Sequence, residues 1–375
     1  MRDDLTLFLI LWAIYAAENW VLTSNRSLLV SLTSRRPPNR PGSGIGNARW
    51  RLSPLLPLPL YHLVSVASQS PLALAPRGIS SRLVQNWATR PLGSTGGQSI
   101  RYENAAPTDS EGSTLRIRGK SFARCDTETE AKALHQWIDE LRDQSAETRS
   151  EKIRQYYQDR FPDTSVIEER IERLRVKTNL HRVLSSVLAV YSLLLFPLAY
   201  YLYPSPQVLL SFLLSSIFGG WILTGFYFRT HRSLYPEEKG KRFQGVLKQV
   251  FCFPVAMGAS KDFSLYAFAD IDPLALSHAT LPEEEFLQIA RTIWLDLEYP
   301  LIDEPDPIVA ESREILKEVS AEYLTRLGLR PTELSKALEA LDSATTCYCP
   351  RCHSEFNQPR ETCSECPGVA VISTQ

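Results

Sequence analysis

Residues 183–228 read VLSSVLAVYSLLLFPLAYYLYPSPQVLLSFLLSSIFGGWILTGFYF. This stretch contains two apolar runs, 183–203 and 208–228. At a helical rise of about 1.5 Å per residue, each run is long enough to cross a hydrocarbon core of about 30 Å. The four residues between them, 204–207, leave room only for a turn. The sequence therefore predicts a transmembrane helical hairpin, with aromatic side chains at its ends where an interfacial belt is expected.

A third apolar run covers residues 5–22 and predicts a transmembrane helix over residues 1–23. The alternative is a cleaved signal peptide. The residues before the run carry no net positive charge, however, and no small-residue cleavage site follows it. Glu18 is the one acidic residue within the three apolar runs, which makes it a candidate intramembrane polar site. Its place near the end of the run favours an interfacial or helix-packing role.

Basic residues indicate how the chain is oriented. Lys and Arg gather after the first run, before the second and after the third, whereas the hairpin turn is uncharged. All three basic clusters can face the cytoplasm at once if the N-terminus is outside. The sequence thus predicts a multi-pass protein of the cell membrane with a cytoplasmic C-terminus. Residues 24–182 and 229–375 would then share the cytosol.

Residues 24–98 are rich in Pro, Ser and Arg. The stretch 24–102 contains ten Arg and no Asp, Glu or Lys. Such a segment fits a position near anionic lipid headgroups, or a disordered basic linker. Its prolines exclude a long helix, so we expect short irregular strands close to the membrane surface. The lipid bilayer is accordingly the first partner that the sequence predicts.

The remaining soluble parts have recognisable local patterns. Residues 99–146 alternate apolar and polar side chains in two places and then show a capping box at Thr127 and Glu130, which predicts a small α+β domain. Residues 147–182 predict a helical stalk that leads into the hairpin. Residues 229–345 predict a mainly helical region. Within it, the apolar stretch 243–269 is an interfacial, re-entrant or buried segment.

The tail carries five of the seven cysteines. Cys349 and Cys352 form one C-x2-C pair, and Cys363 and Cys366 form a second pair ten residues later. Four thiolates with this spacing can close a tetrahedral metal site. In an oxidising compartment the same cysteines would indicate disulfides, so the predicted cytoplasmic location favours the metal.

Over residues 347–370 only, this pattern resembles zinc ribbons and rubredoxin-like knuckles. The resemblance implies a small ribbon over residues 346–375 that holds one structural zinc ion. Iron is the alternative, although the ten-residue spacer is short for a rubredoxin fold. Cys347 would be surplus. Charges in the module are balanced, so a nucleic-acid partner is not expected.

The chain contains no H-E-x-x-H, G-x-S-x-G or P-loop motif, and no catalytic constellation emerges. Asp270 and Asp272 could bind a cation, but a solvated turn is the simpler interpretation. We therefore predict an α-helical membrane protein with three transmembrane helices, a small cytosolic α+β domain and a C-terminal zinc ribbon. The expected function is a scaffold or regulatory protein whose ribbon binds a protein partner or a second copy of the chain. The alternative is a subunit of a membrane enzyme or transporter that uses Glu18 and the segment 254–272.

Overall fold

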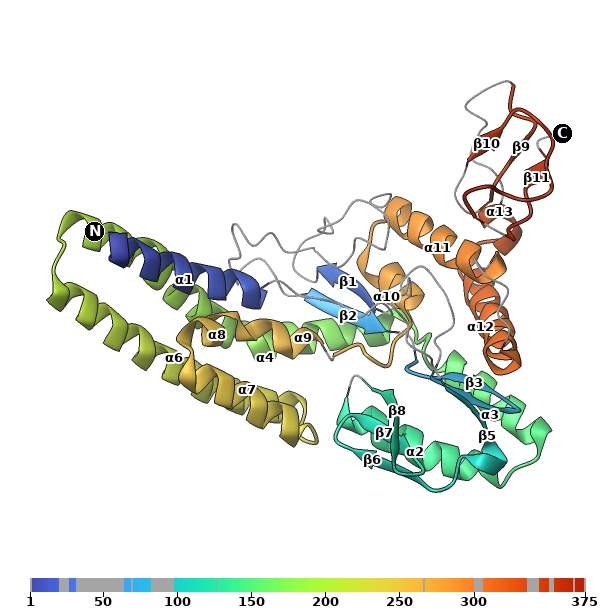
Figure 1. Ribbon diagram of the computed structural model, residues 1–375, viewed down its shortest axis with the longest axis horizontal. Coiled ribbons are helices and arrows are strands. Elements are labelled where there is room, and N and C mark those ends of the chain that lie inside the picture. Colours follow the sequence, from blue (N-terminus) through green and yellow to red (C-terminus); the bar gives the residue numbers. More distant parts are fainter. Residues whose placement is uncertain are drawn as a thin grey trace.

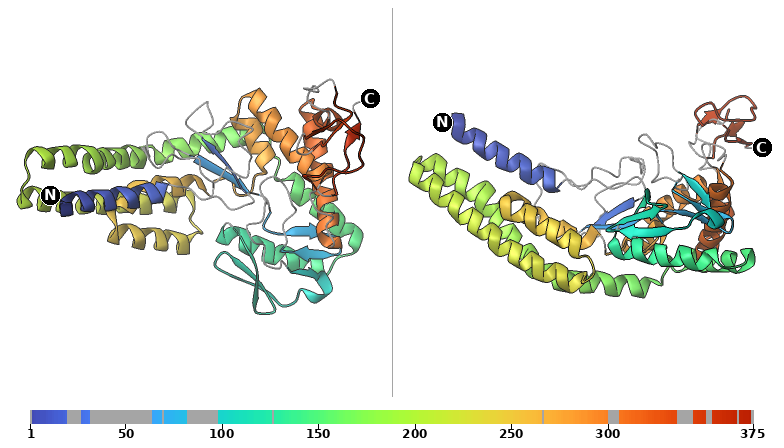
Figure 2. Two further views of the ribbon diagram at one scale, coloured as in Figure 1. Left: turned by 45° about the horizontal axis from the view of Figure 1, so that its top comes forward. Right: turned by 60° about the horizontal axis from the view of Figure 1, so that its bottom comes forward.

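The molecule is elongated and mainly helical. The computed structural model describes residues 2–19, 27–31, 64–68, 70–81, 98–125, 127–265, 267–299, 306–335, 344–350, 354–366 and 368–373. Apolar helices project to one side, and the C-terminal strands lie at the opposite end (Figure 1). Between these ends, helices and short strands form the body of the protein, which Figure 2 shows from two further sides.

Two long apolar helices form the projecting hairpin. The first covers Thr164–Leu202 and consists of α4 (Thr164–Val190), a π-helical turn (Tyr191–Leu195) and α5 (Phe196–Leu202). The second is α6 (Pro206–Leu234). By length and composition both helices could cross a membrane. The two long apolar helices of the predicted hairpin, joined by a short turn, are therefore present in the structure.

Local sequence explains how the hairpin turns. The hydroxyl of Ser205 accepts a hydrogen bond from the N–H of Gln207 (3.3 Å), and Pro206 occupies the first turn of α6. Across the hairpin, the hydroxyls of Ser192 and Ser216 lie 3.2 Å apart. Serine pairs of this kind let two apolar helices approach closely and satisfy each other's polar groups.

Helix α1 (Arg2–Asn19) lies beside this hairpin (Figure 1). The ring of Phe8 packs against Phe196 and Phe212, at centroid distances of 5.6 and 5.9 Å. Among the described residues, α1 has a shorter apolar stretch, Thr6–Tyr15, than a span requires. The third transmembrane helix therefore stays a prediction.

After α6 the chain folds back along the hairpin. It forms α7 (Lys239–Phe251), α8 (Phe253–Gly258), a 3₁₀ turn (Ala259–Lys261) and α9 (Asp262–Leu265). A small hydrophobic cluster joins α8 to α1, α4 and α6. Its buried members are Tyr15, Leu188, Ala189, Leu223, Phe253, Ala256 and Met257.

The body contains two three-stranded antiparallel sheets, ordered β3-β4-β5 and β6-β7-β8. Helices α2 (Glu128–Arg142) and α3 (Ala146–Gln158) follow them. The hydroxyl of Thr127 accepts a hydrogen bond from the N–H of Glu130 (2.9 Å), which confirms the predicted start of α2. The strands are β3 (Ala73–Ala75), β4 (Gly78–Ser80), β5 (Ser99–Arg101), β6 (Thr108–Glu111), β7 (Thr114–Ile117) and β8 (Lys120–Arg124), with a 3₁₀ turn at Tyr102–Asn104 after β5.

The other elements complete the body and the C-terminal end. An antiparallel pair, β1-β2, lies near α9 and α10, and a third small sheet has the order β10-β9-β11. These elements are β1 (Ser27–Ser31), β2 (Val64–Ser68), α10 (Pro273–Thr280), α11 (Glu283–Glu298), α12 (Pro307–Arg326), α13 (Pro331–Leu334), β9 (Cys347–Tyr348), β10 (Glu355–Phe356) and β11 (Ile372–Ser373).

One large hydrophobic core unites the body. It takes side chains from β3 and β4, from α2 and α3, from the first half of α4, and from α10 to α12. The N–H of Leu74 in β3 donates to the hydroxyls of Tyr157 (3.2 Å) and Ser312 (3.1 Å), which ties three distant segments together. One apolar face of the residues predicted as a stalk, with Ile153 and Ile167 among its side chains, is thus buried in this core, and so are β3 and β4 from the proline-rich segment 24–98.

Candidate functional site

The C-terminal cysteines belong to a small three-stranded sheet. Strand β9 is central and pairs antiparallel with β10 on one side and with β11 on the other. Cys349 directly follows β9, whereas Cys363 and Cys366 lie on the chain that runs from β10 to β11. The sheet therefore brings together two cysteine segments that are separate in the sequence.

Tight turns position these cysteines. The N–H of Cys349 donates to the carbonyl of Ser354 (3.0 Å) and closes the first turn. The N–H of Cys363 donates to the carbonyl of Val369 (2.9 Å) and closes the second. Gly368 has a φ of +81°, a left-handed conformation that glycine adopts without steric cost. The chain can therefore turn tightly after the second cysteine pair.

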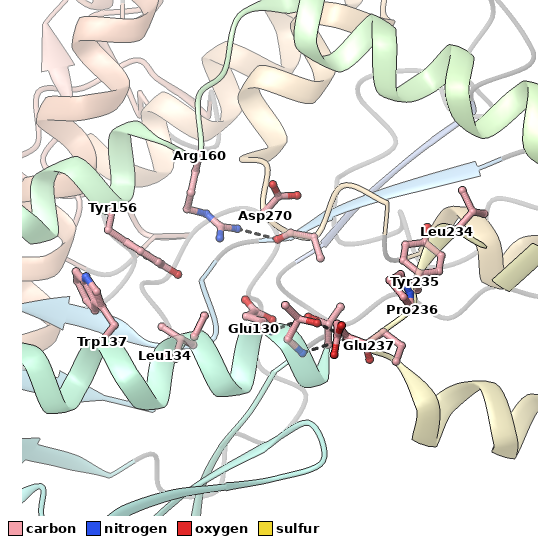
Figure 3. A pocket seen from close by; sticks show the side chains of 15 residues that line it. Glu130, Leu134, Trp137, Tyr156, Arg160, Leu234, Tyr235, Pro236, Glu237 and Asp270 are labelled. Carbon is pink, nitrogen blue, oxygen red and sulfur yellow. Dashed lines mark hydrogen bonds between the residues drawn. The ribbon is translucent and has the colours of Figure 1, made fainter. Parts of the chain in front are cut away.

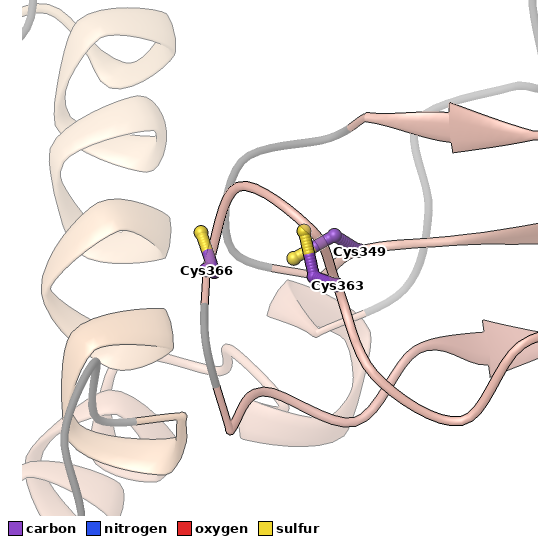
Figure 4. Close-up of side chains that lie close together, drawn as sticks. All are labelled: Cys349, Cys363 and Cys366. Atoms are coloured by element: carbon purple, nitrogen blue, oxygen red, sulfur yellow. The ribbon is translucent and has the colours of Figure 1, made fainter.

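Three sulfur atoms converge between these turns (Figure 4). The Sγ atoms of Cys349, Cys363 and Cys366 all lie within 4.8 Å of one another, and all three residues are buried. Sulfurs that each lie about 2.3 Å from one tetrahedral metal ion are about 3.8 Å apart, so this spacing is compatible with a single ion. No disulfide joins any two of the described cysteines. The cluster can therefore bind a metal ion.

Two other cysteines lie close by in the sequence. Cys352, the predicted fourth ligand, falls outside the described residues, so the four-cysteine set stays a prediction. Cys347 is buried in β9, and its Sγ donates to the carbonyl of Gln358 at 3.4 Å. Cys347 is not part of the three-sulfur group.

An apolar shell surrounds the sulfurs. Val369 is buried among them, and Phe356, Val371 and Tyr299 pack against the group. The guanidinium of Arg360 lies 4.4 Å from the centroid of the Phe356 ring and covers it from outside. Such a shell limits the access of water to thiolates and metal. Tyr299 directly follows α11, so the ribbon packs against the end of that helix.

The other residues singled out in the sequence have separate positions. Glu18 lies in the last turn of α1, and its side chain is outside the described part of the structure. Asp270 is exposed and forms an ion pair with Arg170, with the nearest atoms 2.8 Å apart. The interpretation of residues 270–272 as a solvated turn is wrong for Asp272. That residue is buried, and its carboxylate accepts a hydrogen bond from the N–H of Leu274 (2.8 Å) at the start of α10.

Burial also changes the acidity of this aspartate. It raises the pKa of Asp272 to about 6, although the hydrogen bond from Leu274 and the nearby guanidinium of Arg160 act in the opposite direction. Arg160 is itself buried and donates to the carbonyl of Ala269 (3.1 Å). Arg160 also lines a cavity that could not be identified from the sequence.

This cavity has a volume of about 530 Å³ and opens between the body and the end of the hairpin (Figure 3). Its wall includes two aromatic rings, Trp137 and Tyr156, whose centroids are 5.1 Å apart. No local motif could have indicated it, because its lining comes from four distant segments. Residues with polar atoms on that lining include Glu130, Arg160, Glu237, Glu238 and Asp270.

Arg160 is a buried, positively charged side chain on the lining of the cavity. Burial alone would lower the pKa of this guanidinium, but Tyr156, Glu130 and the neighbouring aspartates raise it, so the group stays charged. An aromatic wall, one buried cation and several carboxylates are features of a site for a small polar molecule.

Comparisons with known proteins add no further constraint. No protein family, curated protein or solved structure matches the chain. Functional conclusions therefore rest on the cysteine cluster, the apolar helices and the cavity.

Proposed function

We propose that this protein is a membrane-anchored scaffold or regulatory protein whose cytoplasmic zinc ribbon binds a protein partner. One observation carries the proposal. Three buried cysteines converge on a small ribbon at the end of the molecule opposite the projecting apolar helices (Figure 1). In this arrangement the hairpin fixes the protein in a bilayer, and the ribbon is held away from the lipid.

Zinc is the metal that we assign to the cluster, with Cys352 as the fourth ligand. Four thiolates without an open position are typical of structural zinc sites. The strands of the ribbon are two residues long, so hydrogen bonding between them contributes little stability. Metal binding would supply the missing free energy of folding, as it does in other small metal-dependent modules.

We assign α1 as the third span of the anchor. Its 18 residues correspond to about 27 Å of helix, close to the thickness of the hydrocarbon core. Aromatic packing of Phe8 against the hairpin supports a position within the same helical group. The basic residues that flank the hairpin support a cytoplasmic location for the body and the ribbon.

A protein partner suits the outer surface of the ribbon. Asn357, Gln358, Arg360, Glu361 and Glu365 are exposed there, and charges of both signs are present. A nucleic-acid site would require a clustered positive charge instead. A second copy of this chain is the other protein partner that the surface allows.

Photo-crosslinking tests the proposed function. A photoreactive residue at Glu365 of the full chain, in native membranes, should give a discrete adduct with a protein. The adduct should disappear in the additional variant Cys366→Ser, while the amount of protein in the membrane fraction stays the same. A photoreactive residue at Glu333, also exposed but outside the ribbon, is the matched control. An adduct that survives the loss of the metal would show that the ribbon is not the docking module.

The cavity favours a second function, that of a subunit of a membrane enzyme or transporter. Its lining includes Ala269 and Asp270, which belong to the segment 254–272, together with several carboxylates and one buried arginine. Under this alternative, Arg160→Met should abolish binding of a small polar ligand and leave ribbon crosslinking unchanged. Under the leading proposal, Arg160→Met changes neither the yield of the Glu365 adduct nor the identity of the crosslinked protein.

A further inference from the structure

We propose that α7 and α8 form a re-entrant segment, which enters the bilayer beside α6 and leaves it on the same side. The exposed apolar face of α7 would then contact lipid acyl chains. This inference rests on the proposed membrane anchoring of the hairpin.

Helix α7 runs antiparallel to α6 and in close contact with it. Near its start, the guanidinium of Arg242 lies 5.6 Å from the centroid of the Phe228 ring. One turn later, a Cβ added to Gly245 would lie 2.4 Å from the hydroxyl oxygen of Tyr227, so the Tyr227 side chain packs directly against the backbone of α7 there. The contacts thus move backward along α6 as the chain moves forward along α7.

The end of α7 reaches still farther back. The indole N–H of Trp221 donates to the carbonyl of Val250 (3.1 Å). A Cβ on Gly220 would lie 2.7 Å from the Cβ of Phe253, the first residue of α8. The segment therefore follows α6 from Phe228 to Gly220 before it turns.

These contacts set the depth of the segment. The apolar run of α6 ends at Phe228, and Trp221 lies two turns of helix before that point. Two turns correspond to about 10 Å, or roughly a third of a hydrocarbon core of about 30 Å. After α8 the chain returns toward the end of the apolar run of α6. The ring of Phe263 in α9 packs 5.3 Å from that of Tyr227, and the hydroxyl of Tyr227 donates to the carboxylate of Asp262 (3.3 Å).

The turning point meets the requirement that lipid places on irregular backbone. Broken helices are tolerated at membrane depth only where protein covers the backbone groups that the break leaves over. Here the break is at Cys252, between α7 and α8. Trp221 satisfies the carbonyl of Val250, and α8 is buried against α1, α4 and α6.

The outer face of α7 is apolar and open. Phe243 is 67% exposed and Phe251 is 82% exposed, and Leu247 and Val250 lie exposed on the same face. A contiguous apolar patch of this kind indicates a contact surface.

Continuity identifies the occupant as lipid. The apolar face of α7 adjoins the exposed side chains of Trp221, Ile222 and Phe228 on α6, the helix that we assign to the bilayer. Lys239 and Lys248 are also exposed on α7, and long lysine side chains near a membrane surface can extend their ammonium groups to anionic headgroups.

Photo-crosslinking to lipid tests the proposal. Full-length protein would be reconstituted into vesicles of phosphatidylcholine and phosphatidylglycerol, with benzoylphenylalanine in place of one residue at a time. Position 251 tests α7. Position 218 on α6, where Phe218 is exposed in the proposed span, is the control for membrane anchoring. Position 333 on α13 is the control for background. Mass spectrometry would detect phospholipid adducts.

We expect phospholipid adducts at positions 251 and 218, in comparable yield, and none at position 333. Adducts at 218 without adducts at 251 would overturn the re-entrant segment and leave the membrane anchor intact. A protein adduct at 251 would overturn it as well, because another chain would then cover α7. Absence of adducts at both 218 and 251 would contradict the membrane anchoring on which the inference rests.

Discussion

Single cysteines in the tail differ in what they contact, and this difference can be measured. Cys366 belongs to the convergent group, whereas Cys347 points its sulfur to a backbone carbonyl. Cys366→Ser should therefore remove the metal, since a hydroxyl is a poor ligand for zinc. Structural zinc contributes on the order of 10 kcal/mol to the folding of small modules, so the ribbon should unfold with it. Elemental analysis of the purified full chain, together with proteolysis of the tail, measures both effects.

Cys347→Ser is the matched control, because it changes the same atom type in the same module. It should retain one zinc per chain. The ligand set would be wrong if Cys347→Ser lost the metal while Cys366→Ser kept it. Iron in place of zinc would correct the identity of the metal without changing the ligands.

Asp272 should make stability depend on pH. Its folded pKa of about 6 lies above the ordinary value of 3.8, so the folded state binds the proton more tightly than the unfolded state does. The free energy of unfolding should therefore fall as the pH rises from about 4 to about 6. Above that range the full destabilisation by the ionised Asp272 should be present. A pKa difference of this size corresponds to a loss of about 3 kcal/mol in the free energy of unfolding, as an upper value. Asp272→Asn removes the charge but keeps a side chain that can cap α10.

The expected result is that Asp272→Asn is more stable than the parent at pH 8, and that the two converge near pH 4. Chemical unfolding in detergent, followed at both pH values, gives the difference directly. Protonation of the ribbon thiols affects both proteins equally and cancels. If the two proteins differed by the same free energy of unfolding at both pH values, the carboxylate of Asp272 would not titrate between pH 4 and pH 6.

Among the packed elements, the contact between α8 and α6 depends on the absence of a side chain at Gly220. A Cβ at Gly220 would meet the Cβ of Phe253 at 2.7 Å, whereas one at Gly225 would meet nothing within 4 Å. Gly220→Ala should therefore destabilise the protein by about 1–3 kcal/mol through overpacking. Gly225→Ala should be neutral or stabilising by up to about 1 kcal/mol, because alanine favours helix. Thermal unfolding in detergent compares the two, and equal effects would argue against close packing of α8.

A second contact between elements links the hairpin to the body. The buried carboxylate of Glu238, just after α6, accepts hydrogen bonds from the N–H groups of Glu128 and Thr129 (both 3.1 Å) at the start of α2. Glu238→Gln should weaken this link by about 1–3 kcal/mol, since a charged acceptor is lost from the helix N-terminus. Hydrogen exchange of the first turn of α2 should become faster.

Glu237→Gln is the control for that experiment. It removes the same charge from the neighbouring exposed residue and should leave the exchange of α2 unchanged. Faster exchange in both variants would indicate a general electrostatic effect instead of a specific cap.

Some elements could be predicted from local sequence and others could not. The hairpin follows from apolar length, and the start of α2 follows from Thr127 and Glu130, because both signals are local. The strands β3 and β4 carry no signal for their burial. Leu74 lies in the core because Tyr157 and Ser312, far away in the chain, supply its hydrogen bonds. Proline-rich composition therefore predicted short strands but not the burial of β3 and β4 in the core.

At the scale of the whole molecule, the same distinction applies to the sites. The three cysteines of the metal cluster belong to two C-x2-C pairs that are only ten residues apart, so local spacing could predict them. The cavity takes Trp137, Arg160 and Asp270 from separate segments, so only the fold brings it into existence. The first half of α4 belongs to the body's core and the rest of the same helix belongs to the apolar hairpin. A single continuous helix thus connects the proposed anchor to the soluble part.

In the proposed topology the hairpin spans the membrane and the ribbon end lies in the cytoplasm. Labelling of intact cells with a membrane-impermeant thiol reagent tests it most directly. Gln207→Cys, in the first turn of α6 at the tip of the hairpin, should be labelled in intact cells. Glu333→Cys, on α13, should be labelled only after the membrane is made permeable. Labelling of Glu333→Cys in intact cells, with Gln207→Cys protected, would show that the chain has the opposite orientation.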